Sequence, residues 1–216
     1  MRIGVLGTGA VGEALATRLV ELGDDVVMGS RTAGNEKAVA WSERFPARAG
    51  QGSFADAAAH GQLVVNATAG VNSLAALRAA GAENLAGKTL LDVANPLDFS
   101  AGFPPRLSVV NDDSLGEQIQ REFPTARVVK ALNTMNCQVM VDPFRVPGEH
   151  DVLMAGDDAA AKGEVAGLLE SFGWPAAAII DLGGIGAARG LEAYLPLWLA
   201  LMGSLGTGDF NIHVAR

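Results

Sequence analysis

Short apolar runs alternate with longer amphipathic segments along this chain, and the alternation predicts its elements. The first apolar run, residues 3–6, ends at glycines and has the character of a buried strand. In residues 10–22 apolar side chains recur every three or four positions, which predicts a helix with one buried face. By the same criteria, further strands are expected at residues 25–28, 63–67, 89–93, 127–132, 152–155 and 177–180, and further helices at residues 36–44, 54–59, 74–80, 114–122, 159–172 and 191–205.

Apolar strands that alternate with helices predict the α/β class, a mostly parallel sheet with helices on both faces. The helix at residues 114–122 has the capping-box form Ser-x-x-Glu at its start. Residues 95–113, which are rich in Pro and Asp, are interpreted as a long functional loop rather than a domain boundary.

A glycine-rich turn separates the first strand from the first helix: Gly7-Thr8-Gly9-Ala10-Val11-Gly12 has the spacing G-x-G-x-x-G. Gly7 permits the tight turn, Gly9 lets a pyrophosphate approach the backbone, and Gly12 lets the helix pack closely on the strand. The N–H groups at the helix N-terminus can then donate to phosphates. Because the motif lies between a strand and a helix, we interpret it as a dinucleotide-binding fingerprint of a Rossmann-like, doubly wound sheet, in preference to a turn without a ligand.

The end of the second strand selects the cofactor. Chains that bind NAD usually carry an acidic residue there, but this chain has Gly29-Ser30-Arg31-Thr32. Arg31 can bind a 2′-phosphate, Ser30 and Thr32 can donate hydroxyls, and Lys37 adds a second cation nearby. The pattern predicts NADP(H) rather than NAD(H), and the alternative is an ordinary solvated arginine.

Small and polar residues follow three other predicted strands. Ligands of an open parallel sheet bind beyond the carboxyl ends of its strands, so these residues can border the ribose and nicotinamide. Ordinary turn chemistry is the alternative for each of them. The residues are Ala67 and Thr68, Ala94, Asn95 and Pro96, and Asn133.

Side chains suited to general acid–base catalysis are scarce. The only tyrosine, Tyr194, does not belong to a Tyr-x-x-x-Lys pair, and no lysine follows Lys162. The three histidines form no metal-binding pattern, and Cys137 is better interpreted as a buried thiol than as a nucleophile. We therefore predict no catalytic side chain and no metal site. Hydride transfer to a second ring cofactor requires mainly positioning, whereas reduction of a ketone requires a proton donor.

Composition narrows the function classes further. The 216 residues are 49% apolar, and 24 acidic against 16 basic side chains give a net charge of −8, which disfavours nucleic-acid or anionic-membrane binding. A single cysteine rules out a disulfide framework. The apolar segment at residues 191–205 is shorter than a membrane span of ~20 residues and suits a buried helix or an oligomer contact. We expect a cytoplasmic protein.

Several stretches, in order along most of the chain, resemble the coenzyme F420-dependent NADP oxidoreductases. The resemblance implies a homodimer formed through the last helices, and direct hydride transfer between NADPH and a deazaflavin ring. The same nucleotide-binding module is similar to the reductase domain of the STEAP metalloreductases. The stretches that carry the resemblance are residues 3–9, 29–31 with Lys37, 92–96, 114–117, 127–134, 155–158, 181–183 and 189–195.

The resemblance also implies an arrangement of domains and contacts. An NADP-binding domain is expected at residues 1–140, and residues 141–216 form an extension for the second substrate and the dimer contact, packed as one unit with it. The resemblance assigns Thr8, Gly9, Ala10 and Val11 to the pyrophosphate, Ser30, Arg31 and Lys37 to the 2′-phosphate, and Ala67, Thr68, Ala94, Asn95, Pro96 and Asn133 to the rings.

The sequence leaves the second substrate open. A flavin is compatible with the same site as coenzyme F420. One alternative is an NADPH-dependent reductase of a small imine or carbonyl compound, with a proton donor such as Asp98, Asp112 or Asp113. A second alternative is a non-catalytic module that senses NADP(H) and uses the apolar C-terminal helix as its partner surface.

Overall fold

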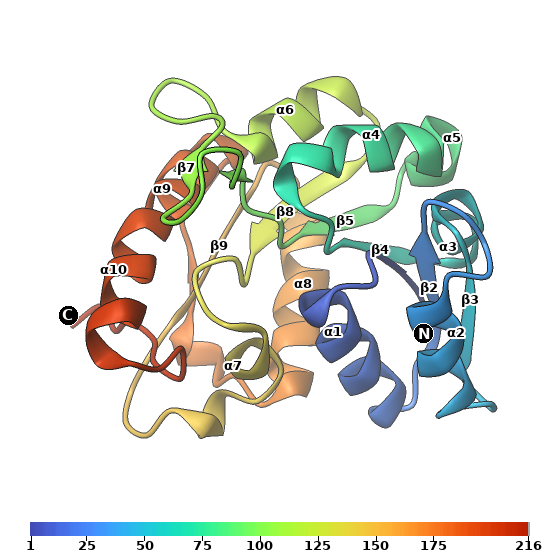
Figure 1. Cartoon of the computed structure of the whole chain (residues 1–216), viewed down its shortest axis with the longest axis horizontal. Helices are drawn as coiled ribbons and strands as arrows, with labels where there is room; N and C mark the ends of the chain where they lie inside the picture. The colour runs from blue at the N-terminus through green and yellow to red at the C-terminus, as the bar shows by residue number, and fades with distance from the viewer. Residues whose placement is uncertain (216) are drawn as a thin grey trace.

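A single eight-stranded sheet forms the centre of the protein, as a computed structural model describes it for residues 1–215 (Figure 1). Its strand order is β10-β9-β8-β5-β4-β1-β2-β3, and every neighbouring pair is parallel except β8 with β9. The strands are β1 (Arg2–Leu6), β2 (Asp25–Ser30), β3 (Ala49–Ser53), β4 (Leu63–Asn66), β5 (Thr89–Asp92), β8 (Arg127–Ala131), β9 (Val152–Gly156) and β10 (Ile179–Asp181). A separate antiparallel hairpin joins β6 (Leu97–Asp98) to β7 (Arg106–Leu107).

Helices cover both faces of the sheet (Figure 1). The helices are α1 (Ala10–Glu21), α2 (Glu36–Glu43), α3 (Phe54–His60), α4 (Gly70–Ala80), α5 (Ala82–Leu85), α6 (Leu115–Glu122), α7 (Cys137–Val141), α8 (Ala159–Phe172), α9 (Ala188–Ala193) and α10 (Leu195–Leu205), with 3-10 turns at Pro143–Arg145, Ala176–Ala178 and Ile185–Ala187.

Two hydrophobic clusters, one on each face of the sheet, hold these layers together. Successive strand residues point to opposite faces, so Val65 and Val129 belong to the cluster under α1, α2, α7 and α8. Their neighbours Val64 and Val128 belong to the cluster under α3, α4, α5, α6 and α9. The predicted mostly parallel, doubly wound α/β sheet is confirmed.

Several predicted elements require correction. The strand expected at residues 177–180 begins only at Ile179, after a 3-10 turn. The helix expected at residues 191–205 is two helices, α9 and α10, with Tyr194 between them. Pro196 lies in the first turn of α10, where its missing N–H leaves no helical hydrogen bond unmade. Strand β3 was not predicted, because Ala49–Ser53 contains no apolar run. As the last strand at one edge of the sheet, it can form without one.

The capping box predicted for α6 forms only in part. Ser114 Oγ accepts a hydrogen bond from the Glu117 N–H at 3.1 Å, but the Glu117 carboxylate pairs with Arg189 at 2.6 Å. A complete capping box begins α3 instead, between Ser53 and Asp56.

The division at residue 140 stays a prediction. Strands β9 and β10 from the proposed extension continue the same sheet as the six strands before them. Within residues 1–215, no helix combines the length and apolar character that a membrane crossing requires.

Candidate functional site

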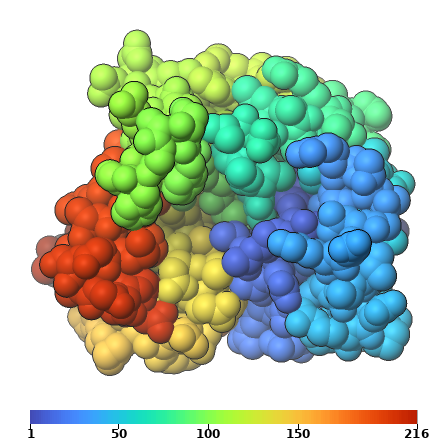
Figure 2. All heavy atoms as spheres, viewed as in Figure 1, coloured from blue at the N-terminus to red at the C-terminus, as the bar shows by residue number. Residues whose placement is uncertain are grey.

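The strand order reverses between β1 and β4, and the carboxyl ends of these strands open onto two neighbouring cavities. Ligands of doubly wound folds bind at such a reversal. We call the first, of about 510 Å³, the glycine-turn cleft and the second, of about 450 Å³, the apolar pocket. Ala67, Thr68 and Ala69 line both cavities, so their occupants would meet there. Figure 2 shows this face hollowed where the N-terminal, middle and C-terminal segments converge.

The geometry of the glycine turn follows from close backbone contacts. Gly7 has a φ of 124°, and a Cβ there would lie 2.5 Å from the Ala67 carbonyl oxygen. A Cβ on Gly12 would lie 2.1 Å from the Gly7 carbonyl oxygen, so neither position has room for a side chain. Gly9 has open space around it and precedes α1 without a side-chain cap. The first N–H groups of α1 therefore remain available to an anion.

The end of β2 contributes one arginine to the glycine-turn cleft. Arg31 is exposed, lines the cleft and has no ion-pair partner among residues 1–215. Lys37 is also exposed, but it lies outside the cleft lining. Among residues 1–215, no carboxylate lines this cleft, so an anionic group beside Arg31 would meet no repelling charge from them.

Two hydroxyl residues, Ser30 and Thr32, flank Arg31 without lining the glycine-turn cleft. Ser30 is buried, and its Oγ donates to the Thr32 carbonyl oxygen at 2.5 Å. Thr32 and Pro96 line neither cavity. The predicted residues that the structure gathers around the two cavities are Gly7, Thr8, Gly9, Arg31, Ala67 and Thr68 at the cleft, and Val11, Ala67, Thr68, Ala94, Asn95 and Asn133 at the pocket.

The apolar pocket is enclosed by loops of the sheet and by α10. Within the part of the chain that the structure describes, its lining contains no charged side chain and no histidine. Trp198 of α10 lines it and stacks on Phe210, with ring centroids 5.4 Å apart. Cys137 also lines the pocket. The sequence predicted a buried thiol, but this side chain is half-buried. A pocket of this composition suits an uncharged ring, and its one ionisable side chain among the described residues is the Cys137 thiol.

Paired amides fix the polar wall of the apolar pocket. Asn95 Nδ2 donates to the Asn133 carbonyl oxygen at 2.8 Å, and Asn133 Nδ2 donates to Asn95 Oδ1 at 2.9 Å. Asn133 Nδ2 also donates to the Leu191 carbonyl oxygen at 3.0 Å. Asn133 Oδ1 and Trp198 Nε1 are buried without a hydrogen-bond partner among residues 1–215. Buried polar atoms are usually paired, so these two are candidates to bind a ligand.

Behind the pocket lies a buried cluster of charges that sequence reasoning missed. Lys130 Nζ lies 2.8 Å from Asp92 Oδ2 and 2.8 Å from Glu192 Oε1, and all three side chains are buried. Burial lowers the pKa of Lys130, but attraction to the two carboxylates outweighs it, and the pKa is raised. Two sequence features could have predicted this cluster: a lysine in the middle of an apolar strand and a glutamate in an apolar helix.

A hydrogen-bond chain connects this cluster to both cavities. Thr68 Oγ1 donates to Asn66 Oδ1 at 2.7 Å, and Asn66 Nδ2 donates to Asp92 Oδ1 at 2.8 Å. The pocket wall at Thr68 is therefore tied to the same buried carboxylate as Lys130.

The aspartates considered as proton donors do not line the apolar pocket. A backbone hydrogen bond from Ser100, followed by one from its side chain, lowers the pKa of Asp98. The guanidinium of Arg121 holds the pKa of Asp113 well below its usual range. Both groups are therefore poor acids at neutral pH. Across residues 1–215, no three His, Cys, Asp or Glu side chains gather as a metal site would require.

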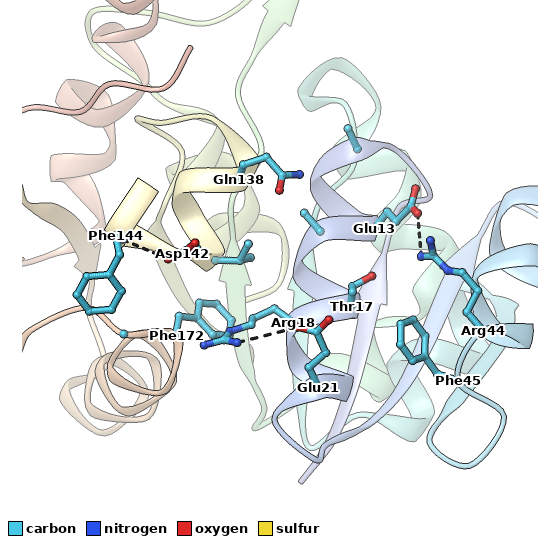
Figure 3. A pocket seen from close by; sticks show the side chains of 14 residues that line it. Glu13, Thr17, Arg18, Glu21, Arg44, Phe45, Gln138, Asp142, Phe144 and Phe172 are labelled. Carbon is cyan, nitrogen blue, oxygen red and sulfur yellow. Dashed lines mark hydrogen bonds and ion pairs between the residues drawn. The ribbon is translucent and has the colours of Figure 1, made fainter. Parts of the chain in front are cut away.

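A further cleft, of about 800 Å³, lies along the outer side of α1 (Figure 3). Among the predicted site residues, only Ala10 lines it. Gln138 projects from α7 on the side of the cleft that faces α1 (Figure 3). The charged side chains that line this cleft largely neutralise one another, because Arg44 pairs with Glu13 at 2.8 Å and Arg18 lies 4.0 Å from Glu21. The cleft along α1 is therefore less suited to binding an anion than the glycine-turn cleft is.

The fold and the glycine turn define a Rossmann-like nucleotide-binding protein, and the relatives of the chain place it among the NADP-dependent oxidoreductases. The family model described as "NADP oxidoreductase coenzyme F420-dependent" matches residues 2–96. The F420-dependent NADP reductase of Methanothermobacter marburgensis is 32% identical over 212 residues, which cover 93% of this chain and 92% of that protein. The chain belongs to the coenzyme F420-dependent NADP oxidoreductase family.

Other similarities extend the comparison. Metalloreductase STEAP3 of Rattus norvegicus is 33% identical over 204 residues, but the chain spans only 38% of its length. A crystal structure from Arthrobacter sp. FB24, described as a candidate F420-dependent NADP reductase, has 55% identity, full coverage of both chains and a TM-score of 0.93. An imine reductase of Myxococcus stipitatus, solved with NADP⁺, has 19% identity and a TM-score of 0.65, and shares the fold alone.

Proposed function

We propose that this protein transfers hydride between NADP(H) in the glycine-turn cleft and a flavin-like or deazaflavin ring, coenzyme F420 included, in the apolar pocket. The observation that carries the proposal is the shared wall at residues 67–69. It joins a cleft suited to a nucleotide to a pocket that has no charged lining residue. NADP(H) supplies the hydride, and the residues of this chain bind and orient the two rings.

The residues present fit NADP(H). The open backbone at Gly9 and the uncapped start of α1, Ala10 and Val11 included, would hold the pyrophosphate. Arg31 would hold the 2′-phosphate by charge-assisted hydrogen bonds, with Lys37 as a more distant cation. Ser30 and Thr32 would act indirectly, because the hydrogen bond between them shapes the backbone on either side of Arg31.

The apolar pocket would position the second ring. Thr68, Ala94 and Asn95 form the sheet side of its wall, and Trp198 forms the helical side. Fixing two rings in contact removes most of the orientational cost of hydride transfer. The proton needed by a reduced ring would come from solvent, since no acidic side chain lines the pocket.

Anaerobic stopped-flow mixing tests this proposal. NADPH is mixed with the protein and with coenzyme F420, FMN or riboflavin in turn, and the absorbance of NADPH and of each ring is followed. We expect loss of NADPH to match reduction of at least one ring. No oxidation of NADPH with any of the three would refute the proposal.

Reduction of a small imine or carbonyl compound remains an alternative for the same pocket. It would need a proton from water, because Asp98 and Asp113 lie outside the pocket and have lowered pKa values. Turnover of imines without turnover of any ring cofactor would favour this alternative. Tight NADPH binding without any turnover would favour a sensing module instead.

We also propose that the protein is a cytoplasmic homodimer whose copies meet at α10. Leu197 and Leu205 of this helix are each 56% exposed, and only Leu195 of α10 is buried. A contiguous apolar helix face of this kind is typical of a contact surface. The free thiol of Cys137 fits a reducing compartment.

A further inference from the structure

The two walls of the apolar pocket come from distant parts of the chain. Ala94 and Asn95 follow β5, whereas Leu195 and Trp198 belong to α10, about a hundred residues later. The width of the pocket therefore depends on how the C-terminal helices are attached to the sheet. Most side chains of α10 are exposed or half-buried, so α10 itself contributes little to that attachment.

Besides the bond from Asn133 Nδ2 to the Leu191 carbonyl oxygen, Glu192 of α9 provides a deeply buried polar attachment. Its Oε1 accepts from Lys130 Nζ at 2.8 Å and from the Gly116 N–H at 3.0 Å. Its Oε2 accepts from the Leu115 N–H at 2.8 Å. The side chain is 2% exposed, so each of these bonds is shielded from water. One carboxylate thus joins α9 to β8 and to the first turn of α6.

Lys130 connects Glu192 to the Ala94–Asn95 wall on the other side of the pocket. Besides Glu192 and Asp92, its Nζ donates to the Ala94 carbonyl oxygen. The Ala94 N–H in turn donates to Asp92 Oδ1 at 3.3 Å. The cluster therefore holds both polar atoms of the Ala94 backbone, and Ala94 lines the pocket.

We propose that Glu192 is a positioning residue, which sets the distance between the α10 wall and the Ala94–Asn95 wall and thereby selects the second substrate. The identity of that substrate as a ring cofactor rests on the function proposed above. Buried ion clusters contribute little net stability, because desolvation offsets their attraction, but they can specify one arrangement of the elements they join. Here the arrangement specified is the shape of the pocket.

The chemistry of the site requires a carboxylate rather than an amide. Three donors converge on Glu192: one ammonium and two backbone N–H groups. A glutamine has one acceptor oxygen, and its NH₂ group would face a donor on the remaining side. Glu192→Gln would therefore keep the size of the side chain but lose either the bond from the Leu115 N–H or the bonds from Lys130 and the Gly116 N–H.

A matched control is available on the same pair of helices. Glu117 of α6 pairs with Arg189 of α9 at 2.6 Å, but the Arg189 side chain is 44% exposed. This pair joins α6 to α9 without touching Lys130 or Ala94. Glu117→Gln therefore removes a helix–helix contact and leaves the buried cluster in place.

Two readouts test the proposal independently. Cys137 is the only cysteine and lines the apolar pocket, so its alkylation rate by iodoacetamide reports the shape of the pocket with no substrate present. The second readout is the KM of whichever ring cofactor is turned over. We expect Glu192→Gln to change the alkylation rate and the KM by ~10-fold each, while the Kd of NADPH changes by less than ~2-fold. Glu117→Gln should change none of them.

A second variant keeps the test decisive if Glu192→Gln does not fold. A Cβ on Gly116 would lie 3.0 Å from Ala188 Cβ and 3.7 Å from Glu192 Oε1, so Gly116→Ala wedges α6 from α9 without removing a charge. We expect it to change the alkylation rate in the same direction, but less.

The outcomes separate this proposal from the proposed function. If either cluster variant folds and alkylates like Glu117→Gln, Glu192 does not position the pocket. The same conclusion follows if the Kd of NADPH rises as much as the KM. If the wild-type protein reduces no ring cofactor, the proposed function fails, but the Cys137 measurement still decides the role of Glu192.

Discussion

The ammonium of Lys130 lies 2.8 Å from the carboxylate of Asp92, and neither side chain has any solvent exposure. These residues occupy adjacent parallel strands, β8 and β5, at paired positions of the register. The contact brings a full positive charge into the layer beneath the candidate site. Its presence there depends on the two carboxylates that surround it.

Lys130→Met should destabilise the fold strongly. It leaves Asp92 and Glu192 buried without their cation, and breaking a buried pair in this way costs about 3–5 kcal/mol. Urea unfolding at pH 7 measures the change. As a control, Lys162→Met removes the ion pair with Asp181, whose side chain is 45% exposed. This substitution should lower the unfolding free energy by no more than about 1 kcal/mol. Equal losses in the two variants would contradict the prediction.

Asp113 should contribute to the dependence of stability on pH. The Arg121 hydrogen bond lowers the folded-state pKa of Asp113 below its unfolded value of 3.8. Its contribution is therefore complete above that pH and is lost as the pH falls further. Asp113→Asn should lower the unfolding free energy by about 1 kcal/mol at pH 7 and flatten its decline below pH 4.

The neighbouring Asp112→Asn serves as the control for this titration. No hydrogen bond or ion pair holds the Asp112 side chain within residues 1–215, so its substitution should leave the acid limb unchanged. Thermal unfolding recorded from pH 2 to pH 7 compares the variants. If the stability of Asp113→Asn declines below pH 4 as steeply as that of the wild-type protein, the ion pair between Asp113 and Arg121 contributes nothing to this decline.

Arg31→Asp should change the choice of cofactor. The variant would lose the proposed charge-assisted contact with the 2′-phosphate, worth about 1.5–3 kcal/mol, so NADPH binding should weaken by at least ~10-fold. NADH lacks that phosphate and should be affected little. Titration calorimetry with both nucleotides measures this, with Arg2→Asp, at the amino end of β1, as the control. Equal weakening for NADPH and NADH would mean that Arg31 does not select the cofactor.

Gly9→Ala should separate binding from folding. A Cβ at Gly9 meets no atom within 4 Å, so the melting temperature should stay the same. The same Cβ occupies the space through which a pyrophosphate approaches, and the Kd of NADPH should rise by ~10-fold or more. Gly12→Ala is the comparison, because its Cβ would lie 2.1 Å from a backbone oxygen and should destabilise the fold by about 1–3 kcal/mol. Unaltered NADPH binding in Gly9→Ala would argue against this site.

Leu197→Glu should dissociate the proposed dimer. The substitution places a charge on the exposed apolar face of α10, where burial against a second copy would be costly. Sedimentation velocity compares its mass with that of Leu22→Glu, an exposed leucine at the end of α1. A monomeric wild-type protein, or a dimeric Leu197→Glu, would overturn the proposed interface.

The glycine turn and Arg31, which form the proposed nucleotide site, could be predicted from the sequence alone. The first strand, the glycine turn and α1 are consecutive, so local spacing predicts their geometry, and Arg31 follows the next strand directly. In each case the signal lies within a few residues of the structure that it predicts. Backbone sterics at Gly7 and Gly12 then leave little freedom in how the turn can form.

The buried charge cluster behind the apolar pocket follows from the packing of the chain and could not be predicted from local sequence. Lys130, Asp92 and Glu192 lie in three elements far apart in the chain, and nothing in their local patterns predicts that they meet. The same is true of the break at Tyr194, which turns one apolar segment into two helices and gives α10 its place beside the pocket. Periodicity reports which face of an element is buried, whereas the identity of the group it meets depends on how the sheet and helices pack.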